Sequence, residues 1–386
     1  MKIGIITYWQ SNDNYGQLLQ CYALQRYLVQ IGHEPFLIRY DISNRYSANN
    51  KWKKVLKILM VYPVLKYLLN KKKKSQQAKL LAEISQKNTL RKFDDFREHM
   101  IVQSSQLYSS LSELQNNPPQ ADWYVTGSDQ VWSQLLNNKE NEAFFLNFGD
   151  KNIKRMSYAA SFAMDEYPQK LHKALKTNLN RFQAISVREK TGIDICSKVG
   201  AFAKVVVDPT LLLDSNSYRK IASNKKYKNY FYVYSLNISS ADEMYFDEIK
   251  LLAHKQKCEI VVTPASGCVP GLELFGDITY DYANIPEWIA NIDNAEVVIT
   301  TSFHGIVFCL LMHTQFVYIP LKGELSKMNN RILNLLEALE LEDMIAYSAN
   351  DVEKIVKRNI NWKNIEQHLF LMKDSSVSFL NKNIKQ

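Results

Sequence analysis

The sequence has few cysteines, and none of them is placed for chemistry. Its five cysteines form no CxxC pair. They are Cys21, Cys196, Cys258, Cys268 and Cys309. Three of them lie inside apolar segments, which favours free thiols in a reducing cytoplasm over a disulfide framework. No other group of residues has metal-ligand spacing, so the sequence predicts neither a bound metal nor a resident cofactor.

Long apolar runs are also missing. The opening residues, MKIGIITYWQSNDNYG, contain too short an apolar run for a signal peptide. With 46% hydrophobic and 23% charged residues, the composition is that of an ordinary globular protein. A chain of 386 residues is too long for one ordinary core, so two or three domains are expected, in the cytoplasm.

Acidic residues are absent from residues 51–74, where nine lysines are interspersed with apolar side chains and Trp52. The rest of the chain has 39 basic and 39 acidic residues, so this segment carries the whole formal charge of +9. Four of its lysines form its end: Lys71, Lys72, Lys73 and Lys74. The segment is too short and too interrupted to span a bilayer comfortably.

A basic amphipathic segment with an aromatic residue fits contact with an anionic membrane surface. This predicts a cytoplasmic protein bound peripherally to the inner face of the membrane. The alternative is a helical insertion that packs on its own domain with a solvated lysine face. No nucleic-acid partner is expected, because the sequence shows no binding module and no regular spacing of stacking aromatics.

The remaining sequence alternates between apolar strands and amphipathic helices. A strand at 2–8, a helix at 16–31 and a strand at 35–40 open the chain, and the same rhythm returns after residue 122 and again after residue 229. This pattern predicts an α/β fold with two Rossmann-like, doubly wound domains facing a cleft. The predicted domains are 1–214 and 215–350, followed by a helical segment at 351–386. A lysine-rich helical insertion without clear strands is expected at about 45–110.

The run TTSFHG, Thr300–Gly305, is the strongest candidate site. It follows a predicted strand at 295–299 and precedes an apolar helix at 306–312. Ligands bind at such junctions in open α/β sheets, and a helix N-terminus favours anions. Gly305 lets the backbone approach a ligand, and His304 titrates near neutral pH. Alternatively, Ser302 simply caps the helix and His304 is a buried, satisfied histidine.

Three further loops follow predicted strands. Residues 12–20 (NDNYGQLLQ) could hold an anion on backbone amides, although a lone glycine is a weak signal. Residues 126–132 (TGSDQVW) contain Asp129, with helix capping by Ser128 or Asp129 as the alternative. Residues 186–189 (SVRE) place Arg188 at a strand end, with a surface Arg–Glu pair as the alternative.

A cleft lined by several cations and one carboxylate would suit a small polyanion and a hydroxylated acceptor. The residues in question are Arg188, His304, Lys322, Arg331 and Asp129.

The ordered set NYGxxLQ, TGSDQVW, SYAASF, SVRE, VVDPTLLL and TTSFHG resembles the polysaccharide pyruvyl transferase family. The resemblance implies a GT-B-like fold, with the donor bound on the C-terminal domain and the acceptor on the N-terminal one. It implies transfer of a pyruvyl group from phosphoenolpyruvate to two hydroxyls of a sugar, which forms a cyclic ketal in a capsule or exopolysaccharide precursor. The sugar is expected on a lipid diphosphate, with phosphoenolpyruvate as co-substrate and no cofactor.

By the same resemblance, His304 corresponds to the family's donor histidine and Arg188 to an arginine at that site, while Asp129 is an acidic candidate on the acceptor side. Further donor-side candidates are Ser302, Phe303 and Gly305. Further acceptor-side candidates are Asn14, Tyr15, Gln17, Ser128 and Trp132.

Family members often carry arginine where this chain has Ser302, so Lys322 or Arg331 is expected to supply the missing cation. The alternatives are a nucleotide-sugar glycosyltransferase of the same fold and a non-catalytic, membrane-associated relative.

Overall fold

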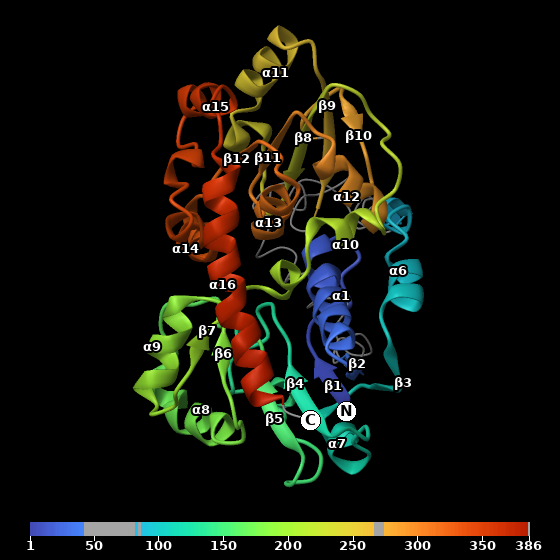
Figure 1. Ribbon diagram of the computed structural model, residues 1–386, viewed down its shortest axis with the longest axis vertical. Coiled ribbons are helices and arrows are strands. Elements are labelled where there is room, and N and C mark those ends of the chain that lie inside the picture. Colours follow the sequence, from blue (N-terminus) through green and yellow to red (C-terminus); the bar gives the residue numbers. More distant parts are fainter. Residues whose placement is uncertain (42–81, 84–85, 266–273, 385–386) are drawn as a thin grey trace, which may run out of the picture.

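The computed structural model describes residues 1–41, 82–83, 86–265 and 274–384. The elements form two lobes stacked along the long axis of the molecule (Figure 1). Trp52 and Lys71–Lys74, predicted to contact a membrane, lie outside the described residues, as does much of the expected insertion. None of the described helices is long and apolar enough to cross a membrane.

The N-terminal lobe contains a five-stranded parallel sheet of order β3-β2-β1-β4-β5. Its strands are β1 (Lys2–Ile6), β2 (Glu34–Tyr40), β3 (Gln103–Tyr108), β4 (Trp123–Thr126) and β5 (Lys154–Ser157). A short parallel pair follows, β6 (Ser186–Val187) and β7 (Lys204–Val205). The helices are α1 (Tyr15–Gln30), α6 (Phe93–Met100), α7 (Leu111–Asn116), α8 (His172–Leu179) and α9 (Lys190–Lys198), with 3₁₀ helices η1 (Lys139–Phe145) and η2 (Gln169–Leu171).

The C-terminal lobe repeats this design with the parallel order β10-β9-β8-β11-β12. Its strands are β8 (Tyr230–Ser235), β9 (Glu259–Pro264), β10 (Thr279–Tyr280), β11 (Val297–Thr300) and β12 (Phe316–Tyr318). The α-helices are α11 (Phe246–Lys255), α12 (Ile285–Asp293), α13 (Phe303–Met312), α14 (Asn330–Ala338) and α15 (Ala349–Val356). The 3₁₀ helices are η4 (Ala241–Met244), η6 (Gly323–Asn329) and η7 (Glu342–Met344).

In each sheet the first strand along the chain lies in the centre and the order reverses beside it, between β1 and β4 and between β8 and β11. This is the strand order of a Rossmann-like sheet, in which ligands bind at the carboxyl ends of the strands next to the reversal. The prediction of two Rossmann-like, doubly wound units is therefore confirmed.

Two helical segments connect the lobes. The chain passes from one lobe to the other through η3 (Pro209–Leu212) and α10 (Ser215–Arg219). The long helix α16 (Trp362–Asn383) then runs back along both lobes (Figure 1). Its Ser376 Oγ accepts a hydrogen bond of 3.0 Å from the Val207 N–H of the N-terminal lobe.

Helix α1 joins the two cores. The Tyr15 ring stacks on Trp288 of α12 at 5.2 Å, and its hydroxyl donates to the Ala283 carbonyl at 2.6 Å. Both rings are fully buried. One hydrophobic cluster consequently extends from α1 into the C-terminal sheet, so the first helix belongs to both lobes.

The prediction that residues 45–110 lack strands is wrong, because β3 lies within that range. Its sequence, QSSQLY, is mostly polar because β3 is the edge strand and only part of it is buried. Residues 241–255 form two helices rather than one, because η4 and α11 meet at Tyr245, which has a φ of 53°. The left-handed conformation at this residue interrupts the helix.

Candidate functional site

Three residues from three segments meet between the lobes. Arg188 directly follows β6, His304 lies in the first turn of α13 after β11, and Asp208 precedes η3 on the connection. Arg188 Nη1 donates to Asp208 Oδ2 at 2.7 Å, and His304 Nε2 lies 3.6 Å from the same oxygen. The exposed fractions of the side chains of Arg188, Asp208 and His304 are 2%, 0% and 9%.

Asp208 makes the most polar contacts in this cluster. Its Oδ1 accepts from the Thr210 N–H at 3.0 Å and the Thr210 hydroxyl at 2.7 Å. Its Oδ2 accepts from the Ser128 hydroxyl at 3.0 Å as well as from Arg188. Burial by itself would raise the pKa of the Asp208 carboxyl, but His304 and Arg188 hold it well below its usual range. Asp208 is therefore a carboxylate throughout the neutral range.

Two glycines allow the histidine to sit where it does. A Cβ atom on Gly16, in the first turn of α1, would lie 1.9 Å from His304 Nδ1. A Cβ atom on Gly305 would lie 2.6 Å from Thr300 Oγ1. Ser302 caps α13, since its side chain accepts from the Gly305 N–H at 3.2 Å. The capping interpretation of Ser302 is thus correct, but the histidine is not satisfied, because buried Nε2 has no hydrogen-bond partner.

Two guanidinium groups lie against the ring of Phe303. The Cζ atoms of Arg188 and Arg331 are 5.0 and 5.8 Å from the ring centroid. Burial, together with the charge of Arg188, lowers the pKa of Arg331 to about 10. Arg331 has no hydrogen-bond or ion-pair partner among the described residues, and its Nε is buried. Free N–H groups on two adjacent guanidiniums can bind an oxyanion.

Arg188 is also held by a second carboxylate. Asp129 Oδ1 lies 3.6 Å from Arg188 Nη2, and the Asp129 side chain is 13% exposed. Burial would lower the pKa of Arg188, but Asp208 and Asp129 raise it. Asp129 has a φ of 70°, in the left-handed region that non-glycine residues rarely adopt. Such conformations cluster at functional sites, which agrees with the position of Asp129 beside the arginine.

Some predicted site residues lie elsewhere. Lys322 is exposed, and its Nζ lies 3.3 Å from the Tyr245 hydroxyl and over that ring. Tyr15 and Trp132 are fully buried core residues rather than acceptor contacts. Their polar hydrogens are already bonded, since Trp132 Nε1 donates to the Phe144 carbonyl at 2.9 Å and Tyr15 donates as described above.

Other predicted acceptor residues have local structural partners. Asn14 caps α1 by accepting from the Gln17 N–H at 3.2 Å. The Gln17 side chain accepts from the Ser11 N–H at 2.7 Å, which shapes the loop before the helix. Ser128 is buried against Asp208. Of the acceptor-side candidates, Asp129 therefore remains the one with a partly exposed side chain next to the cation cluster.

The sequence patterns single out neither Asp208 nor Gly16, and they offer Glu189 only as a surface partner of Arg188, which is wrong because both side chains are buried. Glu189 is buried, its Oε1 accepts from the Phe162 N–H at 2.9 Å, and its Oε2 has no hydrogen-bond partner. Asp208 stands in the VVDPTLLL motif, which contributes to the family resemblance without marking this residue as part of the site. That motif was the available signal, but the contacts of Asp208 depend on three distant segments.

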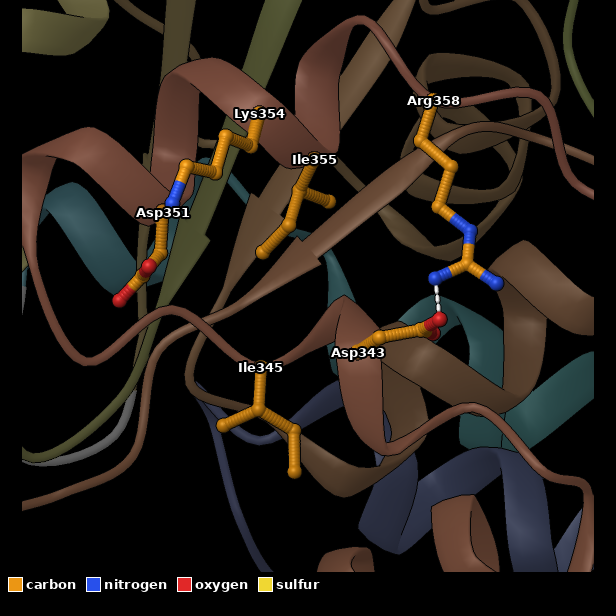
Figure 2. Close-up of a pocket in the computed structure, with 6 residues that line it drawn as sticks. All are labelled: Asp343, Ile345, Asp351, Lys354, Ile355 and Arg358. Atoms are coloured by element: carbon orange, nitrogen blue, oxygen red, sulfur yellow. Dashed lines mark ion pairs between the residues drawn. The ribbon is translucent and has the colours of Figure 1, made fainter.

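A cavity of about 400 Å³ lies away from this cluster, between η7 and α15. Figure 2 shows its charged side chains, with an ion pair between Arg358 and Asp343. None of the predicted site residues lines it. Within the described ranges, no three His, Cys, Asp or Glu residues are grouped so as to hold a metal ion.

The two sheets and the cationic side chains at their strand ends define an α/β protein with two Rossmann-like units and a buried cluster of charged residues between them. Residues 14–323, most of the chain, match the model of the family described as polysaccharide pyruvyl transferase. The chain therefore belongs to the polysaccharide pyruvyl transferase family, which is a family of enzymes that act in polysaccharide biosynthesis. No curated protein matches the sequence.

Several solved structures have a similar chain course. UDP-N-acetylglucosamine 2-epimerase from Rickettsia bellii is 11% identical with a TM-score of 0.48, over 100% of this chain and 99% of the other. The Methanocaldococcus jannaschii UDP-GlcNAc 2-epimerase in complex with UDP-GlcNAc and UDP is 14% identical with a TM-score of 0.47, over 97% and 100%. The spinosyn rhamnosyltransferase SpnG is 8% identical with a TM-score of 0.44, over 98% and 96%.

Proposed function

We propose that the enzyme transfers a pyruvyl group from phosphoenolpyruvate to two hydroxyls of one sugar and so forms a cyclic ketal. The observation that supports this donor is the pair of guanidiniums, Arg188 and Arg331, that lie close to the Phe303 ring and next to His304. Phosphoenolpyruvate carries a phosphate and a carboxylate, each of which suits a guanidinium. The neighbouring imidazole supplies the acid that its methylene carbon needs.

The proposed chemistry uses only residues of this chain. His304, as imidazolium, gives a proton to the methylene carbon, which becomes a methyl group and leaves C2 electrophilic. One sugar hydroxyl bonds to C2 while Asp129 takes its proton. The C2–O bond to phosphate then breaks, phosphate leaves, and the second hydroxyl closes the ketal. The two hydroxyl protons offset those taken up by the methyl group and the leaving phosphate.

The acceptor in this proposal is a sugar on a lipid diphosphate, a precursor of a capsule or exopolysaccharide. Such a substrate lies at the inner face of the membrane, where the nine lysines of residues 51–74 would meet anionic lipid. Replacing Lys71–Lys74 with glutamine should reduce co-sedimentation with anionic vesicles, more at low than at high salt. Activity on a short soluble acceptor should persist. Equal activity losses on soluble and lipid-linked acceptors would contradict a membrane role.

The reaction class can be tested by mass spectrometry. The protein is incubated with phosphoenolpyruvate and a panel of lipid-linked or soluble sugars, and phosphate release is followed in parallel. The proposal expects an acceptor mass gain of one pyruvyl ketal and one phosphate for each. His304→Ala should reduce the rate by roughly 100-fold or more. Glycosyl transfer from nucleotide sugars instead would support a glycosyltransferase, and inactivity with both donors would support a non-catalytic relative.

A further inference from the structure

Asp208 occupies a position that no other described carboxylate shares. It ends the N-terminal lobe, since the connection to the C-terminal sheet begins with η3 directly after it. Its side chain contacts Ser128 after β4, Arg188 after β6 and His304 at the start of α13. One carboxylate therefore connects the strand ends of both lobes at the point where Rossmann-like sheets bind ligands.

The surroundings of His304 make this carboxylate important. The imidazole lies in the first turn of α13 and against the first turn of α1 at Gly16, and helix N-termini disfavour a positive charge. The nearby guanidiniums of Arg188 and Arg331 oppose that charge as well. Asp129 and Glu189 are the other acidic groups near the two arginines. Among the described residues, Asp208 is the one carboxylate within ion-pair distance of the imidazole.

We propose that Asp208 is a positioning residue, which orients Arg188 for the donor anion and stabilises the cationic, proton-donating form of His304. This inference rests on the proposed function and extends it to a residue that does not touch the substrate. Thr210 fixes one carboxylate oxygen, so the other is directed toward Arg188 and His304. The arginine and the histidine come from different lobes, so Asp208 sets their relative position only when both lobes are in contact.

The test compares Asp208→Asn with a matched control, Asp281→Asn. Asp281 is likewise a buried carboxylate, held by Lys226 at 3.1 Å and Asn291 at 2.8 Å, but it belongs to the C-terminal lobe away from this cluster. In Asp208→Asn we expect kcat to fall by roughly 100-fold. The alkaline limb of the kcat profile should move to lower pH, because the imidazolium loses its stabilising charge.

The donor dissociation constant separates positioning from mere structural damage. In Asp208→Asn, poorer orientation of Arg188 should weaken donor binding, whereas loss of a negative charge beside the anionic donor should strengthen it. Because the two effects oppose each other, the donor dissociation constant should change much less than kcat. Asp281→Asn should leave the pH limb in place. Parallel losses of kcat, donor binding and Tm, with an unmoved pH limb, would overturn the inference.

A second measurement needs no turnover. The ring signals of the seven histidines can be followed by NMR against pH, with His304 assigned by its loss in His304→Gln. In the substrate-free protein, the His304 titration should have a lower midpoint in Asp208→Asn than in wild type. An unchanged midpoint would overturn the inference whatever the donor is. A shifted midpoint without any reaction with phosphoenolpyruvate would instead overturn the proposed function and leave the charge coupling established.

Asp208→Glu keeps the experiment decisive if the asparagine variant does not fold. It retains the charge but moves the carboxylate by one methylene. We expect a lower kcat with the alkaline limb in its wild-type position. Wild-type kcat in Asp208→Glu would show that exact placement of this carboxylate is unimportant and would contradict the positioning role.

Discussion

Arg331 carries a partly buried positive charge that has no ion-pair partner within the described part of the chain. Burial lowers its pKa to about 10, which means that the folded site destabilises the charge it holds. A bound anion would remove this penalty. Of the two cations expected to replace the arginine that is absent at Ser302, Arg331 is therefore the better candidate, because Lys322 contacts Tyr245 instead.

Arg331→Gln should weaken phosphoenolpyruvate binding by roughly 10- to 100-fold, as expected for a lost charge-assisted hydrogen bond of about 1.5–3 kcal/mol. Calorimetric titration of the free enzyme measures this directly. Lys322→Gln is the matched control and should bind the donor nearly as well as wild type. The opposite ranking of the two variants would assign the anion contact to Lys322.

The pKa of Asp208 has a consequence for acid stability. Because its folded-state pKa lies well below that of an unfolded aspartate, about 3.9, its ionic contribution to stability is complete above that pH. The contribution is lost as the pH falls below this value toward the depressed folded-state pKa. The Tm difference between wild type and Asp208→Asn should therefore be largest near neutral pH and shrink below about pH 4. Scanning calorimetry across this range tests the sign, and a constant difference would contradict it.

At the scale of elements, what could be predicted depended on burial. Strands such as β8 and β11 are buried on both faces, so they appear as apolar runs that are visible in the sequence. Edge strand β3 is polar and half-exposed, and the two-residue strand β10 is too short to recognise. Local sequence contains no information that distinguishes these edges from loops.

The residues of the candidate site likewise divide into those that local sequence reveals and those that it does not. His304, Arg188 and Asp129 could be predicted because each follows a strand, and strand ends of parallel sheets converge. Tyr15 and Trp132 were misassigned because an aromatic ring with a polar tip suits a core and a sugar site equally well. Asp208 could not be predicted because its partners are far from it in the sequence. Ser128 lies about 80 residues before it, Arg188 about 20 before it and His304 nearly 100 after it, and local patterns do not reveal such contacts.

The contact between α1 and α13 yields an element-scale prediction. Gly16→Ala would place a Cβ atom 1.9 Å from His304 Nδ1, so the imidazole or the helix must move. Alanine favours a helix over glycine by about 1 kcal/mol, so the variant should keep α1 but lose activity strongly. In a double-mutant cycle, Gly16→Ala should lower Tm in wild type and raise or leave Tm unchanged in His304→Ala. Equal Tm changes in both backgrounds would show that the two residues are not coupled.

At the scale of the whole molecule, the charged cluster between the lobes is almost fully enclosed. The side chains of Arg188, Asp208 and His304 are each less than 10% exposed. Two exposed contacts join the lobes beside them. Asn330 Nδ2 donates to Asp165 Oδ1 at 2.8 Å, and Lys190 pairs with Glu337 at 3.6 Å. Surface pairs of this kind contribute at most about 1 kcal/mol each, so they can open readily.

We therefore expect the exposed edge between the lobes to open locally around Asp165 and Asn330 for each turnover, while the buried contacts of α1 stay in place, as in other enzymes whose closure sequesters the reaction. Cysteines at these two positions, joined by a short bis-maleimide in a Cys258→Ser, Cys268→Ser background, should abolish steady-state phosphate release. The uncross-linked double variant and each single variant are the controls and should retain activity. The cross-link should block the passage of substrate but leave the binding site intact. Protein that is first loaded with donor and then cross-linked should therefore retain the donor during gel filtration. Full turnover by the cross-linked enzyme would show that substrates reach Arg188 and His304 without separation of the lobes at this point.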